Sequence, residues 1–130
     1  MELLEDVSGL YAMFDNICNN QKFNVLNRLH HQFQPRGITL LYLLAESHIS
    51  FHSYPENAAC FIDIFTCRTY DNDNVYNEIF NYIVRELDAG VCSRKLIIDR
   101  AISSSAVDDV DECRSVNENS SSENKRCVVS

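Results

Sequence analysis

The chain has 130 residues, 45% of them hydrophobic, and a formal net charge of −8 at pH 7. This length fits one domain, and the acidic charge excludes nucleic acid and anionic membranes as the main partners. No apolar run approaches the roughly 20 residues that a membrane-spanning helix needs. The acidic N-terminus also lacks the basic start of a signal peptide. We therefore expect a soluble, cytoplasmic protein without membrane contact.

The first part of the chain predicts one helix between two strands. Residues 1–8 suggest a short strand that ends at Gly9, and residues 11–20 suggest a short helix. Residues 23–33 carry spaced apolar side chains and predict the second strand. The segment Pro35-Arg36-Gly37 is a turn signal, which separates that strand from the next element.

Three further strands are predicted in the middle of the chain. Residues 38–45 and residues 58–65 are continuous apolar runs of strand length. Between them, residues 47–53 alternate between two sets of side chains, as in a half-buried strand.

The C-terminal part of the domain predicts a helix and a last strand. Apolar residues repeat at helical spacing after an Asp-Asn-Asp start signal at residues 71–73. Gly90 ends this helix, and residues 91–101 predict the final strand. Two helices unevenly interleaved with four to six strands predict an α+β fold. We expect a two-layer sandwich with a largely antiparallel sheet and both helices on one face.

The composition changes sharply near residue 102. Residues 103–130 are rich in Ser, Asp and Glu and lack aromatic residues and apolar periodicity, so ordering them costs more entropy than burial returns. We expect a domain over residues 1–102 followed by a disordered acidic tail. The cysteines show no C-x-x-C pair and no disulfide-scaffold spacing, which favours reduced thiols; they are Cys18, Cys60, Cys67, Cys92, Cys113 and Cys127.

The middle segment concentrates reactive side chains, and by themselves they leave several interpretations open. The simplest is an ordinary strand with polar residues on one face. His48 and His52 suggest a metal site, but no HExxH or C-x-x-C pattern completes one, so we expect no metal. Ser47 lacks the G-x-S-x-G context of a hydrolase. Cys67 with His52 is a candidate thiolate pair.

Four short motifs follow one another in this part of the chain: HQFQPRG at 31–37, AESHIS at 45–50, YPE at 54–56 and DIFTC at 63–67. In sequence and in separation they resemble the short, bacterial-type S-adenosylmethionine decarboxylase proenzymes. The resemblance implies a chain that cuts itself between Glu46 and Ser47, giving fragments 1–46 and 47–130. Ser47 would become a covalent pyruvoyl group, which serves as the only cofactor and forms a Schiff base with the substrate.

The resemblance also implies roles for other residues. His52 would assist self-processing, and the hydroxyl of Thr39, where the family usually has serine, would help it. Cys67 would return a proton to the product carbon. The residues implied to bind the substrate are Phe33, which would stack on adenine, together with Tyr54 and Glu56.

One geometric condition follows from the proposed role of His52. On a straight strand Ser47 and His52 point to opposite faces and lie roughly 16 Å apart. The segment must therefore bend sharply between them, or the histidine must reach the site from a turn.

The flanks depart from the family pattern. The N-terminal strand motif is reduced to residues 6–10, and Leu40 and Arg68 stand where small residues are usual. These changes keep open a pyruvoyl-dependent decarboxylase of ornithine or arginine. A separate alternative is an unprocessed paralogue that acts as a binding or regulatory subunit, although the intact Ser47, His52 and Cys67 argue against it. For the active enzyme we expect a homodimer and a product that donates the aminopropyl group for spermidine synthesis.

Overall fold

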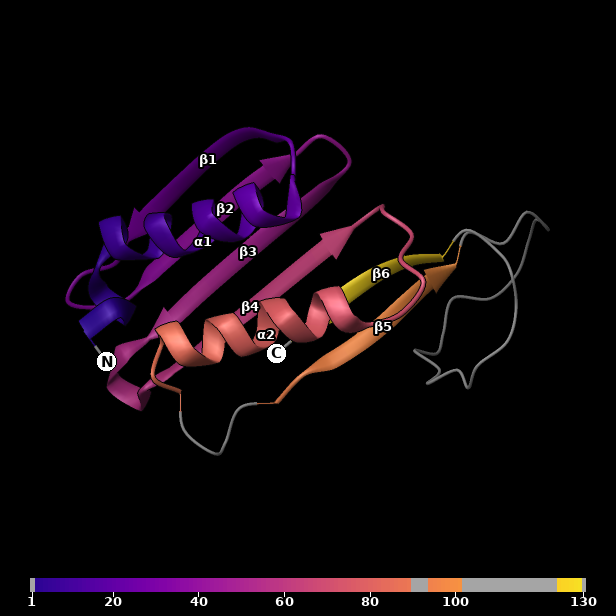
Figure 1. Ribbon diagram of the computed structural model, residues 1–130. Helices are drawn as coiled ribbons and strands as arrows, with labels where there is room; N and C mark the ends of the chain where they lie inside the picture. Colours follow the sequence, from indigo (N-terminus) through magenta and orange to yellow (C-terminus); the bar gives the residue numbers. More distant parts are fainter. Residues whose placement is uncertain (1, 90–93, 102–123, 130) are drawn as a thin grey trace, which may run out of the picture.

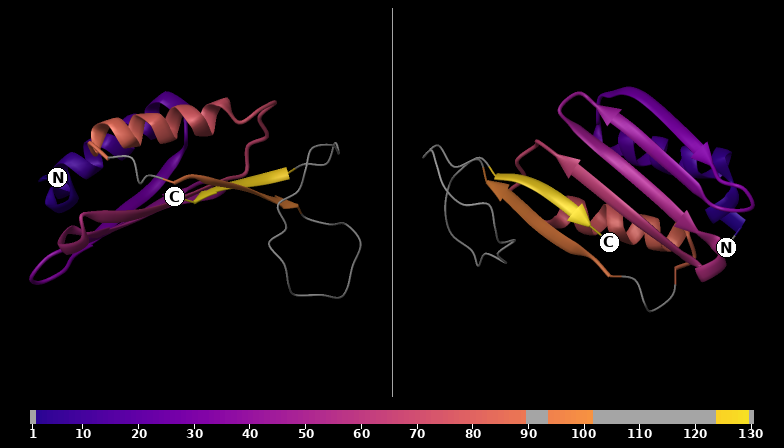
Figure 2. Two further views of the ribbon diagram at one scale, coloured as in Figure 1. Left: turned by 90° about the horizontal axis from the view of Figure 1, so that it is seen from below. Right: turned by 180° about the vertical axis from the view of Figure 1, so that it is seen from behind.

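The computed structural model describes residues 2–89, 94–101 and 124–129 (Figure 1). Their backbone forms one sheet with the strand order β1-β2-β3-β4-β6-β5, in which every neighbouring pair is antiparallel. Helices α1 and α2 cover the same face of this sheet, as the edge-on view in Figure 2 shows. The predicted α+β sandwich with two helices on one face is confirmed. The elements are η1 (Glu2–Glu5), α1 (Val7–Gln21), β1 (Val25–Gln32), β2 (Ile38–Leu44), β3 (Ser47–Tyr54), η2 (Pro55–Asn57), β4 (Ala59–Thr66), α2 (Asn74–Glu86), β5 (Leu96–Ala101) and β6 (Asn124–Val129).

The N-terminal segment differs from the prediction. Residues 2–5 form the short 3-10 helix η1 rather than a strand, and α1 starts at Val7 and continues to Gln21. Helical spacing explains the difference, because one face of this segment can then be buried continuously against the sheet. The buried side chains are Leu4, Leu10, Met13, Phe14, Ile17 and Cys18.

Helix α2 confirms the second predicted helix. Asn72 Oδ1 accepts a hydrogen bond from the Asn74 amide at 2.9 Å, whereas Asp73, the N-cap residue, makes no side-chain capping hydrogen bond. Tyr76, Ile79 and Ile83 then turn into the core. In the described part of the chain, neither helix combines the length and the apolar character that crossing a membrane requires.

Strands β1 to β4 form an antiparallel meander with one covered and one uncovered face. In β2, alternate residues from Ile38 to Leu44 are buried beneath the helices. Leu41 and Leu43 lie on the other face, where no helix covers them. In β3, Ile49, Phe51 and Ser53 face the helices. The apolar run of β2 therefore serves two surfaces, only one of which belongs to the core.

The prediction that the tail is disordered is wrong for its last residues. Residues 103–123 lie outside the described part, but Asn124–Val129 form strand β6 between β4 and β5 (Figure 1). The open edge of β4 offers unpaired backbone groups, and β6 satisfies them. Such an edge is a tertiary feature, which the composition of the tail does not reveal. The last predicted strand is confirmed as β5, beginning at Leu96, while Gly90 lies outside the described residues.

Ser53 ties β3 to the N-terminal segment through a buried hydroxyl. Its Oγ accepts a hydrogen bond from the Ile38 amide and donates one to the Leu4 carbonyl, both at 2.8 Å. Ser53→Ala leaves both backbone groups without this partner, so we expect a loss of about 1–3 kcal/mol in the free energy of unfolding. Urea unfolding in a Ser47→Ala background measures it on an uncut chain. Ser50→Ala, on the uncovered face of the same strand, is the control, and equal losses would contradict the prediction.

Candidate active site

The predicted cleavage bond lies at the tip of the β2–β3 hairpin. Leu44 and Ser47 form the last pair of the ladder, so Ala45 and Glu46 make the turn between the strands. The Ala45 amide donates to the Asn24 carbonyl at 3.0 Å, which holds the turn against the residue before β1. Ala45 and Glu46 are exposed. The bond between Glu46 and Ser47 is therefore accessible at the end of the sheet.

Cys67 lies directly at this bond. It follows the last residue of β4, and its Sγ is 2.5 Å from the backbone oxygen of Glu46, the carbonyl of the predicted cleavage bond. The thiol is placed to donate a hydrogen bond to that oxygen and so to polarise the carbonyl. Burial raises the pKa of the half-buried Cys60 thiol. Burial and the nearby Asp15 raise the pKa of the buried Cys18 thiol to about 11, so both thiols stay protonated. We call Glu46, Ser47 and Cys67 the cleavage half.

Thr39 and His52 also come together, on the uncovered face of the sheet. They oppose each other in the β2–β3 ladder, and Thr39 Oγ1 lies 2.9 Å from His52 Nδ1. His31 opposes Thr39 from β1, and its ring meets that of Phe33 edge to face at 4.6 Å between centroids. The predicted pair of hydroxyl and imidazole is therefore preformed.

The three predicted substrate-binding residues gather at the same end of β3. Phe33 follows β1 and Tyr54 ends β3, and their side chains are 48% and 42% exposed, respectively. Glu56 lies in η2, the turn that follows Tyr54. Gly37, with φ at 106°, lets the turn after β1 approach this region, because a Cβ there would lie 3.1 Å from the Ser53 carbonyl oxygen. We call Thr39 and His52, with these three residues, the histidine half.

Within one chain the two halves are apart. Strand β3 pairs without a break from Ser47 to Tyr54, so it contains no sharp bend. Ser47 and His52 are therefore roughly 16 Å apart along the strand and point to opposite faces. The structure meets neither condition that the sequence set for His52 to act on Ser47 of its own chain.

His48 has a partner that the sequence did not indicate. Its Nε2 lies 3.0 Å from Asp63 Oδ2, and its ring stacks on Phe65 at 5.5 Å between centroids. These contacts hold the start of β3 against β4, next to the cleavage bond. Only the strand register brings these residues together. Among the described residues, no three His, Cys, Asp or Glu side chains are grouped so that they could hold a metal ion.

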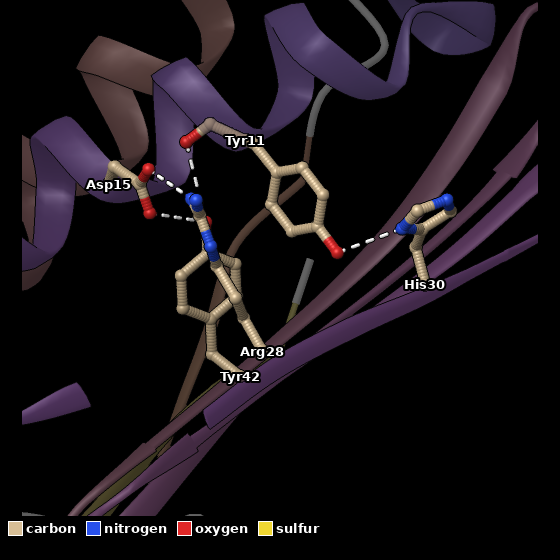
Figure 3. Close-up of polar contacts among 5 residues, drawn as sticks. All are labelled: Tyr11, Asp15, Arg28, His30 and Tyr42. Atoms are coloured by element: carbon tan, nitrogen blue, oxygen red, sulfur yellow. Dashed lines mark hydrogen bonds and ion pairs between the residues drawn. The ribbon is translucent and has the colours of Figure 1, made fainter. Parts of the chain in front are cut away.

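A second polar cluster that the sequence did not reveal lies between α1 and the sheet (Figure 3). Asp15 pairs with Arg28 and accepts a hydrogen bond from the Tyr42 hydroxyl at 2.7 Å. The Tyr11 hydroxyl lies 2.9 Å from His30 Nδ1, and Arg28 stacks over the Tyr11 ring. Burial and the hydrogen bond to Asp15 raise the pKa of Tyr42. The cluster lies on the helix-covered face and its groups bind one another, so it fixes α1 on the sheet.

The uncovered face carries exposed apolar side chains beside the histidine half. Leu29, Leu41 and Leu43 line up on it across β1 and β2, and Phe61 opposes His52 from β4. Leu29 is 55% exposed and Phe61 58%. Apolar patches of this kind mark surfaces that bind a partner.

Comparison with known proteins identifies the family. The S-adenosylmethionine decarboxylase family model matches residues 1–100. A proenzyme of that name from Thermoplasma volcanium is 30% identical over 97 residues, covering 74% of this chain and 72% of the relative. One from Prochlorococcus marinus strain MIT 9313 is 54% identical over 64 residues, which is 49% of this chain and 51% of the relative, so that match spans about half of each protein.

A solved structure agrees in fold. The adenosylmethionine decarboxylase of Aquifex aeolicus VF5 superposes with a TM-score of 0.56 and 28% identity over 67% of this chain and 69% of that one. The fold and the match over residues 1–100 agree with one another. The chain belongs to the S-adenosylmethionine decarboxylase family.

Proposed function

We propose that this chain is a proenzyme that cuts itself between Glu46 and Ser47 and then decarboxylates S-adenosylmethionine, giving the aminopropyl donor for spermidine synthesis. The observation that carries the proposal is the contact of Cys67 Sγ with the Glu46 carbonyl oxygen, at the bond that the motifs mark for cleavage. The relatives named above are S-adenosylmethionine decarboxylase proenzymes. They lend no support to the ornithine or arginine alternative.

Self-cleavage begins with the Ser47 hydroxyl. Its Oγ attacks the Glu46 carbonyl carbon, and negative charge develops on the oxygen that faces Cys67 Sγ. The thiol stabilises that charge by its hydrogen bond. Collapse breaks the C–N bond and leaves an ester. A base then removes the α-proton of Ser47, and the Cβ–Oγ bond breaks to release the Glu46 carboxylate. The remaining dehydroalanine takes up water and loses ammonia, which leaves the pyruvoyl group on fragment 47–130.

The residues around the turn fit this group. It would stand at the first residue of β3, in reach of the Cys67 thiol, and His48 would anchor the strand just behind it through Asp63. The pyruvoyl carbonyl supplies an electron sink for the loss of carbon dioxide, the part that pyridoxal phosphate plays in other decarboxylases. Cys67 then holds the proton that returns to the product carbon.

The base for cleavage comes from a second copy of the chain. In one chain His52 is roughly 16 Å from Ser47 along a straight strand, too far for proton transfer. A two-fold axis that lies between two uncovered faces and crosses the strands near Ser50 sets the His52 end of one β3 over the Ser47 end of the other. There the base has to reach the α-proton of Ser47 and not its side chain, which points to the covered face. The same packing buries the apolar side chains of Leu29, Leu41 and Phe61, which are otherwise exposed. The proposed enzyme is therefore a homodimer with two composite sites.

The exposed aromatic residues of the histidine half suit S-adenosylmethionine. Phe33 offers a half-exposed aromatic ring for stacking on adenine, and Tyr54 offers another for the sulfonium cation. Glu56 adds negative charge to the same end of β3. Ornithine and arginine have no purine ring that would use Phe33.

Intact-mass analysis of the purified protein tests the proposal. We expect two fragments divided before Ser47, the larger with a blocked N-terminus, and release of carbon dioxide from carboxyl-labelled S-adenosylmethionine but not from ornithine or arginine. A chain that stays whole would favour the regulatory paralogue instead. Fragments that act only on ornithine or arginine would keep the cleavage and overturn the substrate.

Replacing Cys67 tests the carbonyl contact. Cys67→Ala removes a donor to the developing oxyanion, so we expect cleavage to slow by about 10²-fold. Cys67→Ser keeps a hydrogen-bond donor, so its cleavage rate should lie between those of wild type and Cys67→Ala. Timed intact-mass samples from cell-free synthesis give the rate constants. Cys60→Ala is the matched control, because Cys60 is also a β4-region thiol but is not near the turn; equal slowing by both alanine variants would refute the contact's role.

A further inference from the structure

We infer that Arg68 is a positioning residue. Its side chain binds the end of α1, and this contact holds the neighbouring Cys67 at the Glu46 carbonyl. The inference rests on the proposed function, since it concerns the residue that acts at the cleavage bond. Arg68 also occupies a position where the sequence departs from the small residues usual in the family.

The guanidinium of Arg68 makes three contacts with the C-terminal end of α1. Its Nη1 donates to the Gln21 carbonyl at 2.5 Å, and its Nη2 donates to the Lys22 carbonyl. Its Cζ lies 5.2 Å from the centroid of the Phe23 ring. Both arms of the fork and the flat face of the guanidinium are therefore in use.

The end of α1 calls for such a partner. The last carbonyls of a helix have no partner within it and carry the negative end of the helix dipole. The last turn of α1 contains no basic residue of its own. Lys22 adopts a left-handed conformation with φ at 56°, which ends the helix and turns its carbonyl outward. Arg68 therefore adds a second positive charge, beside that of Lys22, from a distant part of the sequence, and its donors bind the carbonyls directly.

β6 pairs with Thr66 and the Tyr76 hydroxyl binds it, but β4 ends at that residue and Cys67 has no strand partner among the described residues. The last pair that joins β3 to β4 is His48 with Phe65, and residues 67–70 form no helix or strand. The thiol must nevertheless stay at the Glu46 oxygen. Arg68 is adjacent to Cys67 in the chain. Because the Arg68 side chain binds the end of α1, which packs on the sheet beside the turn, it restrains the backbone of Cys67 as well.

The contacts of Arg68 with the end of α1 require an arginine, and a lysine cannot make all of them. A guanidinium can donate to two carbonyls at once while its face stacks on an aromatic ring, whereas an ammonium is a point charge on a flexible stem. Arg68→Lys therefore keeps the charge and loses the two-armed clamp, and Arg68→Ala loses both.

The experiment compares wild type, Arg68→Ala, Arg68→Lys and Arg85→Ala in cell-free synthesis with timed intact-mass samples. Arg85 is the matched control, because it stacks over Tyr82 on α2 and does not contact the turn. A second readout is the rate at which iodoacetamide modifies Cys67 relative to Cys60 in an uncut Ser47→Ala background. The temperature of unfolding is measured for each variant.

We expect Arg68→Ala to cleave about tenfold more slowly than wild type, because a misplacement of about 1 Å at a reacting site can cost as much as 10²-fold in rate. Arg68→Lys should lie between them and Arg85→Ala at the wild-type rate. Cys67 in Arg68→Ala should be modified several-fold faster, while Arg68→Ala and Arg85→Ala unfold at similar temperatures.

Two results would overturn the inference: Arg68→Ala cleaving at the wild-type rate, or slower cleavage with the reactivity of Cys67 unchanged. If Arg68→Ala does not fold, Arg68→Lys decides by the same two readouts. Failure of the wild type to cleave would refute the proposed function instead, and the iodoacetamide rates would still report on the clamp.

Discussion

Ser47→Ala is expected to leave the protein as a single chain of 14.9 kDa, with cleavage reduced by more than about 10⁴-fold. The alanine has no oxygen to attack the Glu46 carbonyl and no Cβ–Oγ bond to break. Both steps of the proposed processing are removed, and with them the only source of the pyruvoyl group. Decarboxylation should be lost to the same extent, and intact mass and carbon dioxide release measure the two losses independently.

The control for this variant is Ser8→Ala, which removes an exposed serine from α1 and should cleave like the wild type. Thermal unfolding checks that Ser47→Ala still folds, since Ser47 is only half-buried. A Ser47→Ala chain that still divides before residue 47 would show that another group attacks the bond.

Co-expression of Ser47→Ala with His52→Ala is expected to restore cleavage that neither variant shows alone. In a mixed dimer, the intact Ser47 of the His52→Ala chain and the intact His52 of the Ser47→Ala chain belong to the same composite site. With random pairing, about half of the His52→Ala chains would be cut and about a quarter of all sites would be complete. The physical reason is the straight β3, which keeps Ser47 and His52 of one chain apart.

A short tag on one chain lets intact mass show which of the two is divided. Only the His52→Ala chain should be cut. If neither is cut, His52 acts within its own chain or the homodimer packs differently. If His52→Ala is cut when expressed alone, the histidine is not required for processing. A mixture of Ser47→Ala with Cys67→Ala is the control, because both residues lie in the cleavage half and the mixed dimer then contains no complete site.

Much of the fold follows from local sequence patterns. The apolar run at 38–45, the alternation at 47–53 and the helical spacing after residue 73 each predicted the observed element. The helical spacing of the N-terminal segment becomes evident only with the residues beyond Gly9, so residues 1–8 alone predict a strand. Strand β6 was missed because its stability depends on the open edge of β4, more than fifty residues earlier in the sequence.

For the candidate site, the motifs predict a set of residues but not how these residues are arranged. Motif spacing placed Ser47, His52 and Cys67 in one list, while the structure separates His52 from the other two. Contacts such as His48 with Asp63, and Arg68 with the end of α1, join residues from different elements. Only the strand register and the helix packing determine these pairs, so no local pattern could reveal them.

The tight turn between β2 and β3 has a consequence for the lifetime of the mature enzyme. Once the proposed cut is made there, the ladder from Thr39 and His52 to Leu44 and Ser47 joins two separate molecules. Unfolding then releases two species instead of one, so dilution opposes reassembly by mass action. The broken peptide bond is not remade, and a protomer that separates cannot return to the proenzyme. The stability of the proenzyme is an equilibrium between folded and unfolded chains, whereas that of the cut enzyme is kinetic. The lifetime of the active enzyme therefore depends on the rate at which this hairpin opens.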